Sequence, residues 1–130
     1  MSRIEPVGPG DAVRARVPDA LSVHAQTRAT VLQAGVVDQE IKDLCFRYLH
    51  EDDEVVVFEG SDRFDDRQKT ALRWAHAIAW DSDTADEALW KSLHEHFSEP
   101  ELVDLGYAIA LALGQAHWLR TLGIAPELDR

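Results

Sequence analysis

One segment near the C-terminus constrains the fold most strongly. Residues 98–101, Ser-Glu-Pro-Glu, form a Ser-x-x-Glu capping box with a proline in the first turn, which predicts a helix beginning there. The predicted helix runs to about Leu122 and ends at Gly123. From Leu105 to Gly114 it is apolar on almost every side. A helix of this kind belongs at the centre of a core or of an oligomer interface, so we expect an all-α fold built around it.

Other segments also show helical spacing. Helices are expected over residues 19–34, 39–49, 65–79 and 82–97. Pro18 precedes the first of them and Gly35 follows it, and Asp38 precedes the second. The inward face of the first helix is predicted to carry Leu21, Ala25, Ala29 and Leu32. The β-branched run at 55–58 could be a strand. The acidic residues before it and Gly60 after it favour a short helix instead.

The sequence therefore predicts a single-domain helical bundle of about five or six helices over residues 18–124. Residues 1–17, which hold two prolines and two glycines, are expected to form an N-terminal arm or loop, and residues 125–130 a tail. A chain of 130 residues is the usual length of one domain.

Charge and cysteine content exclude several classes of protein. The chain carries 13 Lys and Arg against 24 Asp and Glu, a formal net charge of −11, which repels nucleic-acid phosphates and anionic lipid. Its single cysteine, Cys45, can form no intrachain disulfide. No secretory signal is evident, and the uncharged stretch between Leu105 and Arg120 is shorter than the roughly 20 residues of a membrane span. We expect a cytoplasmic protein that binds neither nucleic acid nor membrane.

Acidic residues are concentrated in residues 38–66, where eleven acids and three bases lie. Such a block is typical of a solvated face or of several helix N-termini. It lacks the spacing of a calcium-binding loop, and the six histidines form no His-x-x-x-His or Glu-x-x-His pair. We therefore expect no metal site and no cofactor.

A few polar side chains fall on otherwise apolar segments. Cys45 lies on the apolar stripe of the 39–49 helix, where a cysteine usually acts as a small hydrophobic residue. Its mostly acidic neighbours favour the thiol over the thiolate. Gln115 or His117, near the end of the long apolar helix, is expected to face a cavity or to pair across an interface, because a buried polar group needs a partner.

Four stretches together resemble the carboxymuconolactone decarboxylase-like family, which includes the alkylhydroperoxidase D-like proteins. They are Gly35–Leu44, Phe64–Ile78, Leu93–Leu105 and Trp118–Ile124. The resemblance covers about residues 30–124. It implies an all-helical subunit that assembles as a homo-oligomer, commonly a trimer or a hexamer.

Redox-active members of that family use a Glu, a Cys-x-x-Cys pair and a His. By this resemblance Asp43 stands at the position of the Glu. Val55 and Phe58 stand roughly at the positions of the two cysteines, and Asp62 roughly at that of the His. A chain with only Cys45 therefore lacks the dithiol. The decarboxylase branch acts on a dicarboxylic lactone without that pair. Binding of such an anion requires cationic side chains, and the acidic segment 38–66 holds few of them.

Three functions follow as hypotheses. The first is binding, and conversion, of a small and largely apolar molecule in a pocket between the 39–49 helix and the long apolar helix. Asp43 and His50 would be the acid–base groups there, with Tyr48, His117 and Trp118 contacting the ligand. The second is a non-catalytic oligomeric scaffold that acts through partners. The third, a peroxidase that pairs Cys45 between subunits, is the least expected.

Overall fold

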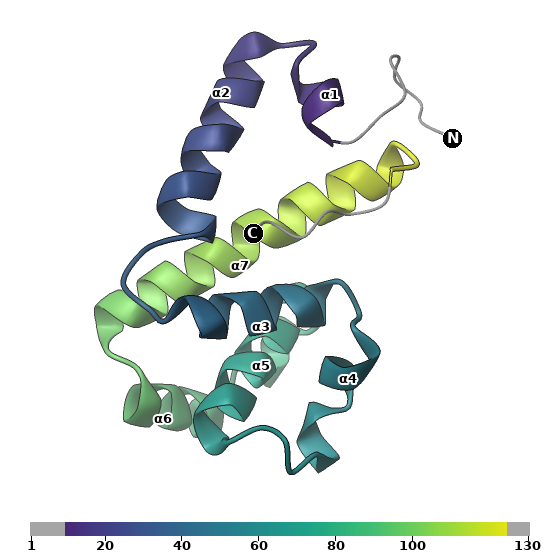
Figure 1. The fold of residues 1–130 in the computed structure, drawn as a ribbon. Helices are drawn as coiled ribbons and strands as arrows, with labels where there is room; N and C mark the ends of the chain where they lie inside the picture. Colours follow the sequence, from purple (N-terminus) through teal and green to yellow (C-terminus); the bar gives the residue numbers. More distant parts are fainter. Residues whose placement is uncertain (1–9, 125–130) are drawn as a thin grey trace.

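The computed structural model describes residues 10–124, and every regular element within them is helical (Figure 1). The seven α-helices are α1 (Gly10–Arg14), α2 (Pro18–Thr27), α3 (Gln39–Leu49), α4 (Asp53–Val56), α5 (Asp66–Ala79), α6 (Glu87–His96) and α7 (Glu99–Thr121). A π-helical turn, η1 (Arg28–Leu32), continues α2, and two 3₁₀ turns are η2 (Phe58–Gly60) and η3 (Ser82–Thr84). The all-α prediction is confirmed. The additional helix is α1, a single turn where a loop was expected; residues 1–9 and 125–130 lie outside the described part of the chain.

The ends of α7 follow the sequence signals. Ser98 Oγ accepts the Glu101 N–H at 3.3 Å, and Glu101 Oε1 accepts the Ser98 N–H at 2.9 Å, so both bonds of the capping box are present. At the other end, Gly123 has a φ of 76°. The N–H groups of Gly123 and Ile124 donate back to the carbonyls of Arg120 and Leu119, which is the Schellman arrangement.

The predicted first helix differs from the structure in its inward face. After Thr27 the chain enters η1, in which the Gln33 N–H donates to the Arg28 carbonyl five residues back. The extra residue in this turn changes which side chains face the core. Leu32 is buried as expected, but Ala25 and Ala29 are exposed. In Figure 1, α2 extends away from α3–α6, with α1 beside it, and the end of α2 that leads into η1 lies near α7.

Aspartate caps decide three other boundaries. Asp65 and Gln68 form a capping box at the start of α5. Asp86 accepts the Leu89 N–H at 2.9 Å and begins α6, so the expectation of one helix over 82–97 is wrong and η3 is a separate turn. Asp52 caps α4, and the 55–58 run forms no strand: Val55 and Val56 end that helix, and Phe58 begins η2.

Asp38 occupies the expected position before α3 but makes a different bond. Its carboxylate accepts a hydrogen bond from Arg67 Nη1 at 2.9 Å and makes no side-chain cap. Asp38 therefore ties the start of α3 to α5 in place of capping its own helix.

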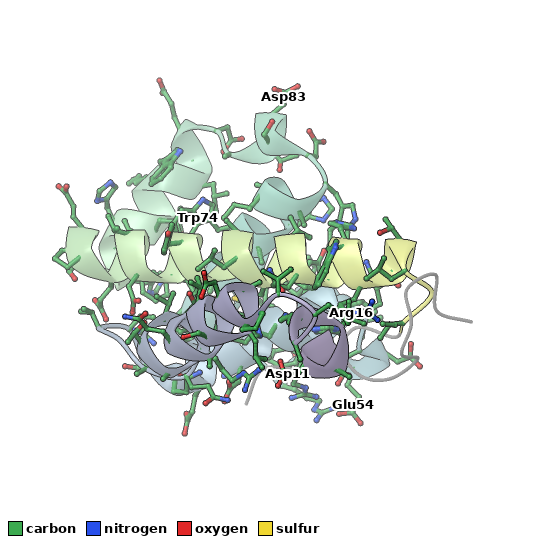
Figure 2. The ribbon with its side chains drawn as sticks, turned by 90° about the horizontal axis from the view of Figure 1, so that it is seen from above. Asp11, Arg16, Glu54, Trp74 and Asp83 are labelled. Carbon is green, nitrogen blue, oxygen red and sulfur yellow. The ribbon has the colours of Figure 1, made fainter. Side chains whose placement is uncertain are left out.

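The core lies where α5 packs against α3, α6 and α7. Trp74 of α5 lies against α7, on the opposite side of that helix from Asp11 and Arg16 (Figure 2). At the contact point α7 carries Gly106, and a Cβ there would lie 2.6 Å from the Trp74 ring. The small residue thus allows the helix to approach the indole, which is almost completely buried.

A buried ion pair joins the loop after η1 to two helices. Lys42 of α3 has no exposed surface, and its Nζ lies 2.8 Å from Asp104 Oδ1 of α7. The ammonium also donates to the carbonyls of Val31 and Ala34. Burial alone would raise the pKa of Asp104. Hydrogen bonds from Lys42 and from backbone N–H groups outweigh this effect and lower it below the ordinary range.

The loop itself closes around this pair. Asp104 Oδ2 accepts the N–H groups of Val36 and Val37 at 2.7 and 2.9 Å. Gly35, with a φ of 128°, lies so close that a Cβ would sit 2.5 Å from both carboxylate oxygens and 2.7 Å from Lys42 Nζ. Any side chain at this position would both strain the backbone and displace the ion pair.

Replacement of Asp104 by Asn should destabilise the fold strongly. The variant leaves the Lys42 ammonium buried without its counter-charge, a change that costs about 3–5 kcal/mol. Urea denaturation followed by circular dichroism measures the free energy of unfolding. Asp83→Asn, on exposed η3, is the matched control and should change it by less than about 0.5 kcal/mol.

Acid should reduce the difference between wild type and Asp104→Asn. Because the native pKa of Asp104 lies below its ordinary value of 3.8, its ionised form stabilises the native state fully above that value. The contribution declines as the pH falls below 3.8 towards the lowered native pKa. A difference that stayed constant through that range would contradict the assigned role of the carboxylate.

Candidate functional site

A cavity of about 540 Å³ opens between α3, α5 and α6, with α4, η2 and η3 at its edges. Its lining combines an apolar wall with several polar side chains, and we call it the α3–α5–α6 cavity. The lining residues are Tyr48, Val56, Phe58, Glu59, Arg73, His76, Thr84, Asp86, Ala88, Leu89 and Ser92. Five separate elements and the start of α6 therefore contribute to one concave surface, as is typical of small-molecule sites.

The central polar contact in this cavity joins Tyr48 and His76. The Tyr48 hydroxyl lies 2.8 Å from His76 Nδ1, which brings α3 and α5 together. Tyr48 follows the helical stripe of Ile41, Leu44 and Cys45, so its ring is buried while its hydroxyl reaches the cavity lining. The pair offers a hydroxyl and an imidazole as hydrogen-bonding groups to a bound molecule.

Aromatic rings fix the position of Tyr48. Phe58 and Trp80 meet its ring edge-on, with centroids 5.7 and 5.4 Å away. Burial, and to a smaller extent the negative charge of Glu59, raises the pKa of Tyr48 above its ordinary value. The hydroxyl therefore stays protonated at neutral pH and can donate a hydrogen bond.

Glu59 and Arg73 form an ion pair at the rim of the cavity. Arg73 Nε lies 2.9 Å from Glu59 Oε2, and Arg73 Nη2 lies 2.7 Å from Glu59 Oε1, so the contact is bidentate. These hydrogen bonds lower the pKa of Glu59 and raise that of Arg73. Both side chains remain about half exposed, so the pair contributes little to stability.

Two further polar contacts border the cavity. The hydroxyls of Thr70 and Ser92 lie 2.8 Å apart and link α5 to α6. Asp86 is held by its capping bond to the Leu89 N–H. Ser92 thus presents a neutral donor and acceptor to the cavity, whereas Asp86 presents a carboxylate.

The structure distributes the residues proposed from the sequence over several places. Tyr48 lines the α3–α5–α6 cavity. Asp43 accepts a hydrogen bond from Gln39 of its own helix at 3.0 Å, and His50 occupies the C-cap of α3. His117 is exposed on α7. Asp43, His50 and His117 lie outside the lining of the α3–α5–α6 cavity, so the expected acid–base pair does not face it.

Trp118 belongs to a different hollow. Together with Arg14, His24 and Gln115 it lines a cavity of about 330 Å³ between α2 and α7. Gln115 Oε1 accepts hydrogen bonds from Arg14 Nε at 3.2 Å and Nη2 at 2.7 Å, and the guanidinium lies 5.6 Å from the Trp118 ring. Gln115 therefore both lines a cavity and has a hydrogen-bond partner, which is Arg14 of α1.

Cys45 is closed off from solvent. It has no exposed surface, its Sγ lies 3.7 Å from the Ala71 carbonyl, and burial raises the pKa of the thiol to about 12. A thiol with these properties is not a nucleophile at neutral pH.

Residues 10–124 hold no group of three His, Cys, Asp or Glu side chains placed to bind a metal ion. Within the same residues, α7 has the length and composition of a membrane-crossing helix, although 39% of its most apolar window is buried in the fold. One such helix is weak grounds for a membrane span, because the central helix of a water-soluble fold has the same properties.

Sequence reasoning identified Tyr48 but missed most of the cavity. His76 also packs against Trp80, with their ring centroids 5.8 Å apart. The contact between His76 and Tyr48 joins residues that are 28 positions apart, far more than one helical repeat. Helical spacing could therefore not predict it. Glu59 and Arg73, which are 14 residues apart, carried no local signal either.

The chain matches no protein-family model, no curated protein and no solved structure.

The Cys45 thiol should be unreactive in the native protein. Because the group is buried and its pKa is about 12, Ellman's reagent should modify it only as fast as the fold opens. In urea above the unfolding midpoint, one thiol per chain should react within minutes. Rapid stoichiometric modification without denaturant would contradict the burial of this side chain.

Proposed function

We propose that this protein binds a small, largely apolar molecule in the α3–α5–α6 cavity. The observation that carries the proposal is the combination of a 540 Å³ hollow, an apolar wall and the Tyr48–His76 contact at 2.8 Å. Val56, Phe58 and Leu89 supply apolar surface for the body of the ligand. The hydroxyl and the imidazole are placed to hydrogen-bond its polar group.

We further propose Tyr48 and His76 as the groups that act on the bound molecule. They replace Asp43 and His50 in this role, because the latter two lie away from the cavity lining. A protonated tyrosine can donate to a developing negative charge on the ligand, and the imidazole can accept a proton. The activity would be that of a lyase or another enzyme that needs no dithiol, since Cys45 is buried.

The resemblance to the carboxymuconolactone decarboxylase-like family fits this proposal. Val55 and Phe58 stand roughly where the redox members carry their cysteines; Val55 is fully buried, and Phe58 forms part of the cavity wall. We propose a member of that family in which apolar side chains have taken the place of the dithiol. The helical fold and the single buried cysteine support this assignment.

Filling the cavity should abolish ligand binding. Ala88→Trp introduces an indole at the lining, so the protein should no longer bind the uncharged probe 2-naphthylmethanol. The wild type should show chemical-shift changes for Tyr48 and Leu89 in NMR titration. Ala29→Trp, on exposed η1 and outside all three cavities, is the matched control and should bind as the wild type does.

Binding that survives in Ala88→Trp, or shift changes confined to residues outside the lining, would contradict this site. A wild type that binds no naphthyl probe at millimolar concentration would contradict the proposed function.

A second candidate function, an oligomeric scaffold, is favoured by the exposed face of α7. Val103 and Tyr107 are 72% and 60% exposed, and Ala110 and Gly114 continue the same face at helical spacing. Beside them, Trp74 and Trp90 help to line a second hollow of about 540 Å³. A continuous apolar face of this kind typically marks a protein–protein contact. We propose that it packs against a second copy, in a trimer or hexamer.

A charge on this face should dissociate the assembly. Tyr107→Glu places a carboxylate on each copy at the proposed contact, so the sedimentation coefficient should fall to that of a 14.6 kDa monomer. Val57→Glu changes a valine that is 62% exposed between α4 and η2, outside the α7 face, and should leave the assembly intact. A wild-type protein that sediments as a monomer at 100 μM would contradict this candidate.

A further inference from the structure

We infer that the α3–α5–α6 cavity selects uncharged ligands over carboxylates, and that Glu59 sets this selectivity by occupying the guanidinium of Arg73. The inference rests on the proposed function, because it concerns the ligand class of the same site. It separates this chain from a protein whose substrate is a dicarboxylic acid.

The charged side chains of the lining favour this reading. Glu59 and Asp86 carry carboxylates, and Arg73 carries the one guanidinium or ammonium group among the lining residues. With histidine counted as neutral, the lining therefore has one more formal negative charge than positive. An anionic ligand would enter a region of net negative charge within a chain that is itself strongly acidic.

The one cation is already engaged. Both oxygens of Glu59 accept hydrogen bonds from Arg73, at 2.7 and 2.9 Å. Glu59 therefore occupies the Nε–Nη2 edge of the guanidinium. A carboxylate ligand would have to displace Glu59 or accept the remaining N–H groups beside the negative charge of Glu59. In either arrangement the negative charge of Glu59 opposes the approach of a second carboxylate to Arg73.

The remaining polar groups suit a neutral partner. The Tyr48 hydroxyl, the His76 imidazole and the Ser92 hydroxyl can donate to, or accept from, an alcohol or a carbonyl. An uncharged molecule that makes these bonds leaves the Glu59–Arg73 pair intact. The geometry thus points to an apolar alcohol or ketone as the ligand class.

Removal of the competing carboxylate should change the selectivity. The probes are 2-naphthylmethanol and 2-naphthoate, which share one ring system and differ in charge, with Kd measured by NMR titration. In the wild type, the Kd of the naphthoate should exceed that of the alcohol by about tenfold or more. In Glu59→Gln the ratio should fall at least about fivefold, because Arg73 then becomes available to the ligand.

Two controls separate this mechanism from a general charge effect. Asp83→Asn removes one negative charge next to the cavity edge without touching Arg73 and should keep the wild-type ratio. The double variant Glu59→Gln/Arg73→Gln should lose the gain in naphthoate binding. The inference is overturned by a wild type that binds both probes equally, or by a ratio that Glu59→Gln leaves unchanged. Failure of the wild type to bind either probe would overturn the proposed function as well.

Discussion

The buried contact between Lys42 and Asp104 joins α3, α7 and the 35–37 loop. A charged ammonium with no exposed surface is tolerated because a carboxylate and two carbonyls surround it. The same carboxylate binds the backbone of the 35–37 loop, which requires glycine at its closest approach. The pair thereby fixes the angle between α3 and α7. Because α3 carries Tyr48, it also fixes one wall of the proposed ligand site.

The candidate site depends on contacts between helices rather than on any one helix. Tyr48 reaches His76 from α3 to α5, Arg73 reaches Glu59 from α5 to η2, and Thr70 reaches Ser92 from α5 to α6. Helix α5 therefore provides a residue to each pair. Its packing against α3, α6 and α7 keeps these side chains in place, so a ligand would meet a surface that is largely formed before it binds.

The two candidate functions concern different faces of the molecule and are compatible. The α3–α5–α6 cavity is lined by residues of α3, α5 and α6. The exposed Val103 and Tyr107 lie on α7, which does not contribute to that lining. Helices α3 and α5 and the turn η1 pack against α7, whereas Val103 and Tyr107 on its remaining face stay exposed. Assembly would complete the burial of α7, and the cavity would remain available for a small molecule.

The sequence by itself determined most of the longer helices, because caps and apolar spacing act within a few residues. The Ser98–Glu101 box, the glycine after α7 and the limits of α3 were all readable in this way. The sequence also excluded a dithiol, since it holds one cysteine. Tertiary structure alone decided that Asp38 pairs with Arg67, that Ala25 is exposed and that His76 meets Tyr48. These outcomes depend on how helices distant in sequence approach one another, and local propensity carries no information about that approach.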